Sequence, residues 1–89
     1  MIASKWKILI LRDLIDGTKR YNELTRSVKG ISAKVLTENL KELEKNGIIT
    51  RKVYPVVPPK VEYSMTDKGN ELKPIIDLMR DYGNKYKDK

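Results

Sequence analysis

Hydrophobic residues recur at helical spacing in segment 4–15, where Ser4 is the predicted N-cap and Gly17 follows the end. A helix on the surface of a domain needs only one apolar stripe. This segment carries two, the first made of Trp6, Ile10 and Leu14 and the second of Ile8, Leu11 and Ile15. The first helix is therefore expected to be buried on both sides. It is either a central core helix or a helix whose second side is covered by a partner chain.

Two shorter helical patterns follow, joined by a turn that contains glycine. The first covers 21–28 and places Leu24 and Val28 inward, before the interruption at Lys29-Gly30-Ile31. The second starts at Ser32, its predicted N-cap, and ends at Asn46-Gly47, a typical C-terminal signal. Its apolar stripe consists of Leu36, Leu40 and Leu43, with Val35 beside it. Two short helices joined by such a turn are the parts of a helix-turn-helix.

The pattern then changes from helical to alternating. Segments 48–54 and 61–66 are predicted strands, and Val61, Tyr63 and Met65 share one face of the second strand. The intervening segment 55–60 contains three prolines, which lack amide donors and predict a stiff, extended hairpin tip. This hairpin is the predicted wing.

The last helical pattern begins after Thr66, its predicted N-cap, and continues to about Tyr86, with Asp67 in the first turn. Pro74 is expected to kink this helix or to lie within its first turns. Its apolar stripe consists of Leu72, Ile75, Ile76, Met79 and Tyr82, with Leu78 beside it.

The order helix, helix, helix, strand, wing, strand, helix predicts an α+β fold of the winged helix-turn-helix type. We expect a three-helix core, a two-stranded β wing and a C-terminal dimerisation helix in a single domain over residues 1–89. Within it, 4–66 would form the winged-helix core and 67–86 the dimerisation helix.

Composition narrows the function. The chain has 19 Lys and Arg against 12 Asp and Glu, a net charge of +7 that favours a polyanionic partner, although a solvated lysine-rich surface is the alternative. It has no cysteine and no histidine, so no disulfide, thiolate or imidazole metal site, cofactor or catalytic activity is expected. The apolar run 8–11 is far too short to cross a bilayer, and no signal peptide is recognised, so a cytoplasmic protein without membrane contact is expected.

Positive charge is concentrated around the helix-turn-helix. Residues 18–34 include five basic side chains against one acid, Glu23, whereas the last helix is balanced. Contacts of such residues with phosphates fix the register on DNA without reading sequence. Outside the second helix of the motif, the expected DNA contacts are Tyr21, Asn22, Arg26 and Lys29, and in the wing Arg51, Lys52, Tyr54 and Lys60.

The second helix of a helix-turn-helix enters the major groove with its N-terminal residues nearest the base edges. Lys34 is suited to donate to guanine, Thr37 to contact a thymine methyl or a base edge, and Glu38 to accept from cytosine N4. The alternative is a solvated helix face. The full exposed face is Ser32, Ala33, Lys34, Thr37, Glu38, Lys41 and Lys45. Stacking of Tyr21 and Tyr54 on single-stranded bases is less favoured, because the two residues lie on different elements.

Several ordered motifs resemble those of HxlR-type winged-helix regulators. Residues 5–14 (KWKILILRDL) resemble the family's "KW…LILREL" opening, and 20–24 (RYNEL) resemble its "RFNEL". Residues 30–37 (GISAKVLT) are similar to "GIS-K-LT", 53–63 (VYPVVPPKVEY) to "YP-VPP-VEY", and Thr66 with Gly69 to the "LT--G" helix start. The resemblance extends from Lys5 to about Tyr82.

The resemblance implies a dimeric, DNA-binding bacterial or archaeal transcription factor whose dimer is built mainly from the terminal helices. The expected interface residues are Trp6, Ile8, Leu11, Leu72, Ile75, Ile76, Met79 and Tyr82. Members often begin with a further segment that carries a cysteine. This chain starts five residues before Trp6 and has no cysteine, so the thiol-based sensing of one branch of the family is not expected.

The expected function is that of a transcriptional regulator that binds double-stranded DNA sequence-specifically, as a homodimer on a pseudo-palindromic operator. Two alternatives stay open: a non-specific architectural DNA-binding protein, with equal affinity for all sequences, and a winged helix used for protein–protein contact, with no affinity for duplex DNA. A small-molecule effector is also left open, although no pocket for one is indicated.

Overall fold

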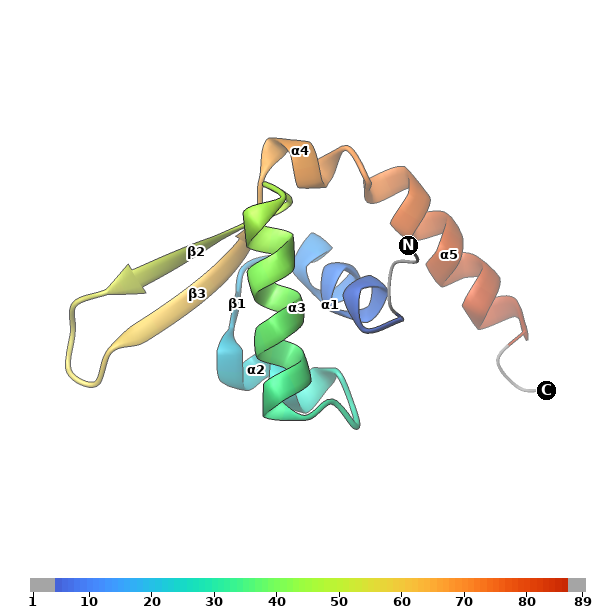
Figure 1. Cartoon of the computed structure of the whole chain (residues 1–89). Coiled ribbons are helices and arrows are strands. Elements are labelled where there is room, and N and C mark those ends of the chain that lie inside the picture. Colours follow the sequence, from blue (N-terminus) through green and yellow to red (C-terminus); the bar gives the residue numbers. More distant parts are fainter. Residues whose placement is uncertain (1–4, 87–89) are drawn as a thin grey trace.

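The computed structural model, which describes residues 5–86 with side chains to residue 81, contains the predicted elements together with one additional short strand and a last helix that is divided in two. Helix α1 (Lys5–Ile15) contacts α2 (Tyr21–Ser27) and α3 (Ala33–Lys45). The hairpin of β2 (Ile49–Tyr54) and β3 (Lys60–Met65) extends to one side of these helices, and α5 (Lys73–Tyr86) extends to the other (Figure 1). The fold is α+β, a winged helix-turn-helix.

The core consists of the residues that the pattern placed inward. Ile10 and Leu14 of α1 meet Leu24 of α2 and the three leucines of α3, and all of them are almost fully buried. Each such side chain contributes about 1.5–3 kcal/mol through burial. The other core residues are Leu11, Val28, Ile49, Tyr63 and Ile76. Trp6, Leu9 and Ile15 pack at the edge of this core, so α1 is a central core helix.

The predicted ends of α3 are confirmed. Ser32 Oγ accepts a hydrogen bond from the Val35 backbone N–H at 3.1 Å, which satisfies one of the free amides of the first turn. Asn46 is the C-cap, and Gly47 follows with a φ of +76°, a left-handed conformation that favours glycine. The predicted N-cap of α1, Ser4, lies outside the described residues.

The sheet has a third strand that the sequence pattern did not predict. Strand β1 (Lys19–Arg20) pairs antiparallel with β3, as Lys19 opposite Tyr63 and Arg20 opposite Glu62, and gives the order β1-β3-β2. The hairpin register runs from Ile49 opposite Met65 to Tyr54 opposite Lys60. A strand of two residues is too short to show a period, and it exists because the outer edge of β3 is available to it.

The prediction of one continuous helix after Thr66 is wrong. Thr66 is the N-cap of a short helix, α4 (Asp67–Asn70), and α5 begins only at Lys73. Pro74 has no N–H to donate to the Asn70 carbonyl, and its ring would collide with that carbonyl in a continuous helix. The chain therefore turns between the two helices, and Pro74 lies in the first turn of α5, where no helical donor is needed.

Helix α5 is joined to the end of α1 by Arg80. Its Nη2 donates to the Arg12 carbonyl at 3.1 Å and lies 3.6 Å from Asp16 Oδ1. The last carbonyls of a helix lack helical partners and carry the negative end of its dipole, so a guanidinium is well placed there. This contact, together with buried Ile76, holds α5 against α1.

Candidate nucleic-acid interface

Helix α3 presents the predicted polar face at the surface. Its leucines are buried beneath it, while Lys34, Glu38 and Lys41 are exposed and Thr37 is half-buried between them. Ser32, Ala33 and Lys45 are exposed as well. Because the N-cap and the leucines fix the rotation of the helix, the two lysines and Thr37 lie along one edge.

One acid of α3 is paired on the side of α1. Lys7 Nζ lies 2.5 Å from Glu42 Oε1, and this hydrogen bond and the attraction of the ammonium hold the pKa of Glu42 below its ordinary value. Glu42 therefore stays ionised through the neutral range, and its charge is compensated chiefly by Lys7.

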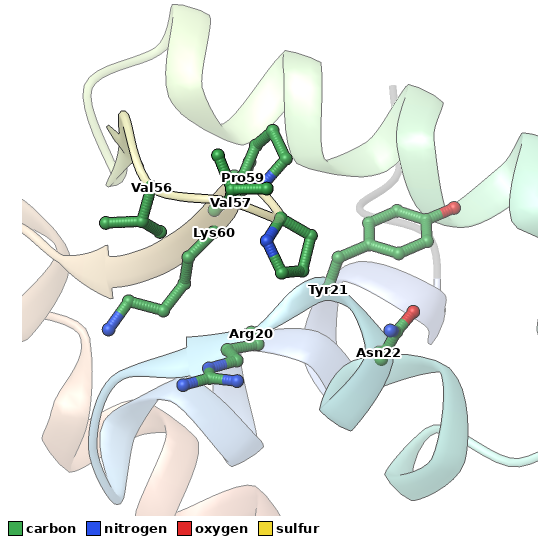
Figure 2. Close-up of a pocket in the computed structure, with 9 residues that line it drawn as sticks. Arg20, Tyr21, Asn22, Val56, Val57, Pro59 and Lys60 are labelled. Carbon is green, nitrogen blue, oxygen red and sulfur yellow. The ribbon is translucent and has the colours of Figure 1, made fainter.

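Tyr21, at the start of α2, is attached to α3. Its hydroxyl donates to the Ala33 carbonyl at 3.2 Å and lies 3.1 Å from Thr37 Oγ1. Figure 2 shows the hydroxyl directed at α3. The ring is thus held between the two helices of the motif and is not free to stack on a base. Its neighbour Asn22 is exposed, as are Arg26 and Lys29 further along this part of the chain.

In the wing, two lysines flank one tyrosine ring. Lys60 Nζ lies 4.5 Å and Lys52 Nζ 5.1 Å from the centroid of the Tyr54 ring, distances at which an ammonium is attracted to the ring face. Lys60 also lies 3.7 Å from Glu62 Oε2. Arg51 is exposed on the same strand as Lys52. The wing therefore carries a compact group of cations at the base of its tip.

Two grooves border this surface. One, of about 340 Å³, lies between α3 and β2 and is lined by Thr37, Leu40, Lys41, Glu44, Arg51 and Tyr63. The other, of about 560 Å³, separates the wing tip from the start of α2 and is lined by Arg20, Tyr21, Asn22 and residues 56–61 (Figure 2). Each contains two cationic side chains, so both grooves suit the phosphates of a nucleic-acid strand.

Arg20 lines the second groove, although it was not among the predicted DNA contacts. It lies across the groove from Lys60, because β1 pairs beside β3. Val56 and Val57 are exposed at the wing tip and were not expected to take part in a site. No feature of the sequence indicates the position of the tip relative to α2.

Helix α5 carries an exposed apolar patch, which we define as Ile75, Leu78 and Met79, exposed by 51%, 70% and 44%. The other expected interface residues lie elsewhere. Leu11 and Ile76 are buried in the core of the chain itself, Leu72 and Trp6 pack at its edge, and Ile8 is half-buried. The side chain of Tyr82 lies outside the described residues.

Within the described residues, no group of three acidic, cysteine or histidine side chains is placed to hold a metal ion. None of the described helices has the length and apolar character needed to span a membrane.

Comparison with known proteins agrees with this geometry. A family model described as HxlR-like helix-turn-helix matches residues 1–89. The chain is 51% identical over 89 residues to the uncharacterized HTH-type transcriptional regulator YdeP of Bacillus subtilis (strain 168). This match covers 100% of the present chain and 70% of YdeP. It is 46% identical over 85 residues to an uncharacterized HTH-type transcriptional regulator of Methanothermobacter thermautotrophicus. This second match covers 96% of the present chain and 65% of that protein.

Solved structures of similar proteins have the same fold. The redox regulator HypR in its oxidized form superposes with a TM-score of 0.89 at 46% identity, over 92% of this chain and 84% of that chain. A protein of Porphyromonas gingivalis W83 described as a transcriptional regulator of the MarR family superposes with a TM-score of 0.89 at 43% identity. The superposition covers 93% of this chain and 81% of that chain. The names of these proteins are those of regulators and not of enzymes.

Proposed function

Since the chain belongs to the HxlR-like helix-turn-helix family of DNA-binding transcriptional regulators, we propose that it acts as a homodimer on a pseudo-palindromic operator. The observation that carries this proposal is the separation of two surfaces. Helix α3, with its cationic edge, lies beside the wing, whereas α5, which carries the exposed apolar patch, extends to the opposite side of the molecule (Figure 1). One surface suits DNA and the other a second copy of the chain.

In this proposal α3 enters the major groove. Lys34, near its N-terminus, would donate to a guanine, with Thr37 and Glu38 at neighbouring base edges. The phosphates on either side would be bound from the two grooves. The proposed phosphate contacts are Asn22, Arg26, Lys29, Lys41, Arg51, Lys52 and Lys60, with Ser32 and Ala33 at the entry of α3 and Tyr54 beneath the wing lysines.

The proposed dimer rests on α5. Monomeric proteins seldom expose adjacent large apolar side chains without a function, and Ile75, Leu78 and Met79 lie within little more than one helical turn. Trp6 and Ile8 of α1 would contribute beside them. A two-fold axis through this patch would place the two α3 helices about one turn of DNA apart, roughly 34–36 Å.

Selection of bound sequences from a random duplex pool tests this function. The wild-type protein is expected to enrich a motif with two inverted half-sites. Lys34→Ala should lose the guanine preference at one position of each half-site, because a good base contact discriminates by about 1–3 kcal/mol. Lys45→Ala, at the far end of α3, serves as the matched control and should leave the motif unchanged. Equal affinity of the wild type for all sequences would favour an architectural role instead.

Lys60→Ala should weaken binding to all sequences alike. A phosphate contact releases counterions, so its loss should lower the slope of log affinity against log salt by about one unit. Lys60→Arg keeps the charge and should keep the slope. Titrations of one operator and one unrelated duplex at several salt concentrations measure both effects. A change in base preference with an unaltered slope would contradict this assignment.

A further inference from the structure

A hydrogen-bonded triangle connects the two helices of the motif beneath the proposed reading face. Tyr21 Oη lies 3.2 Å from the Ala33 carbonyl oxygen and 3.1 Å from Thr37 Oγ1. Ala33 and Thr37 are one helical turn apart on α3, so both face the same tyrosine. Thr37 also lines the groove between α3 and β2, together with Lys41 and Arg51. Thr37 therefore contacts the tyrosine and also borders the surface proposed to meet DNA.

The protons in this triangle can be assigned by counting donors. A phenol has one O–H, whereas a carbonyl oxygen can only accept. The geometry of the Tyr21–Thr37 contact fits either hydroxyl as the donor. Because the one phenol proton is directed at the Ala33 carbonyl, we assign the donor of this contact to Thr37. The Thr37 oxygen then has no proton left to offer to a ligand. It presents lone pairs only.

We propose that Tyr21 is a positioning residue that makes Thr37 an obligate hydrogen-bond acceptor, so that Thr37 selects bases with an exocyclic amino group. This inference rests on the proposed function. In the major groove, adenine N6 and cytosine N4 are donors, whereas guanine O6 and thymine O4 are acceptors. A hydroxyl without a free proton pairs with the first two and opposes the lone pairs of the others.

A free threonine hydroxyl would not discriminate in this way, because it rotates to donate or to accept as its partner requires. Two features of α3 make the preference effective. The branched side chain of Thr37 has few rotamers in a helix, and the tyrosine contact removes the rotation of the hydroxyl. A single neutral hydrogen bond made or lost corresponds to about three- to tenfold in affinity.

The test uses the motif enriched by the wild-type protein and measures competition with each base at each position. At one position, wild type should prefer adenine or cytosine over guanine and thymine on the contacted strand by about three- to tenfold. Tyr21→Phe keeps the ring and should reduce this preference to less than about twofold, with the other positions unchanged. Thr37→Val should abolish it, and the double variant should match Thr37→Val alone.

Thr25→Val is the control, because it removes a hydroxyl that bonds within α2, to the Asn22 carbonyl. It should leave every base preference unchanged. If Tyr21 only braced α2 against α3, Tyr21→Phe would lower affinity for all sequences equally, and that result overturns the inference while the proposed function stands. A wild-type protein without any base preference overturns both.

Discussion

Leu78→Glu is expected to convert the proposed dimer into a monomer and to weaken binding to a two-half-site operator by about 100-fold or more. Leu78 is the most exposed residue of the apolar patch on α5, at 70%. At a two-fold interface the two introduced carboxylates would lie beside each other and lose their water. Neither copy can compensate this loss of hydration or the repulsion between them. The loss of affinity follows because the second half-site is then bound independently. Light scattering and operator titration at the same protein concentration measure the two effects.

The same substitution should leave the folded chain intact, because Leu78 contributes little to the core. The free energy of unfolding of Leu78→Glu, extrapolated to low protein concentration, is expected to lie within about 0.5 kcal/mol of the wild-type value. Asn70→Glu introduces the same carboxylate at an exposed position of α4 and should leave the dimer unchanged. A variant that remains dimeric would place the interface elsewhere, and a monomer with undiminished affinity would contradict the two-half-site operator.

Gly69→Ala is expected to destabilise the chain by about 1–3 kcal/mol, although alanine is intrinsically the better helix former by about 1 kcal/mol. A Cβ at Gly69 would collide with the Ile48 carbonyl oxygen and would lie 3.0 Å from Met65 Cε. The methionine can move, but the carbonyl cannot easily do so. It already accepts a hydrogen bond from the Thr66 backbone N–H at 3.0 Å.

Thermal unfolding at fixed protein concentration checks this prediction, with a shift of about 4–8 °C for each kcal/mol in a domain of this size. Asn70→Ala is the control, since it makes an equivalent change at the next, exposed residue of α4. It should shift the midpoint little. Equal midpoints for Gly69→Ala and wild type would mean that α4 moves away from Ile48 without cost.

Much of the fold was predictable because local signals agreed with one another. The leucines of α3 recur at helical spacing, Ser32 caps the helix, and Gly47 ends it in a left-handed conformation that few other residues adopt. Each of these signals acts within one turn of helix. Pro74 was predicted to kink the last helix or to lie in its first turns, and it lies in the first turn of α5, but the separate helix α4 was not predicted. Local sequence does not show that residues 67–70 form a helix of their own, because this helix is held by the contacts of Thr66 and Gly69 with Ile48, which is distant in the chain.

The polar face of α3 and the basic wing were also predictable as sets of residues, but not as a geometry. Tyr21 was predicted to contact DNA, and the structure adds that its hydroxyl is directed to Ala33 and Thr37. Leu11 and Ile76 were predicted to lie in the dimer interface, whereas both lie in the core of the chain. A helix with two apolar stripes does not reveal which stripe its own domain covers.

The sequence by itself determined the order of the elements, the caps of α3, the inward-facing residues and the positive charge near the helix-turn-helix. These features depend on residues close together in the chain, whose periodicity and backbone preferences act locally. Only the tertiary structure decided the pairing of β1 with β3, the contact of Arg80 with the end of α1, and the hydrogen bonds that direct Tyr21 toward Thr37. Each of these joins segments that are distant in the chain. Their energies depend on how the core brings the segments together, which no local pattern records.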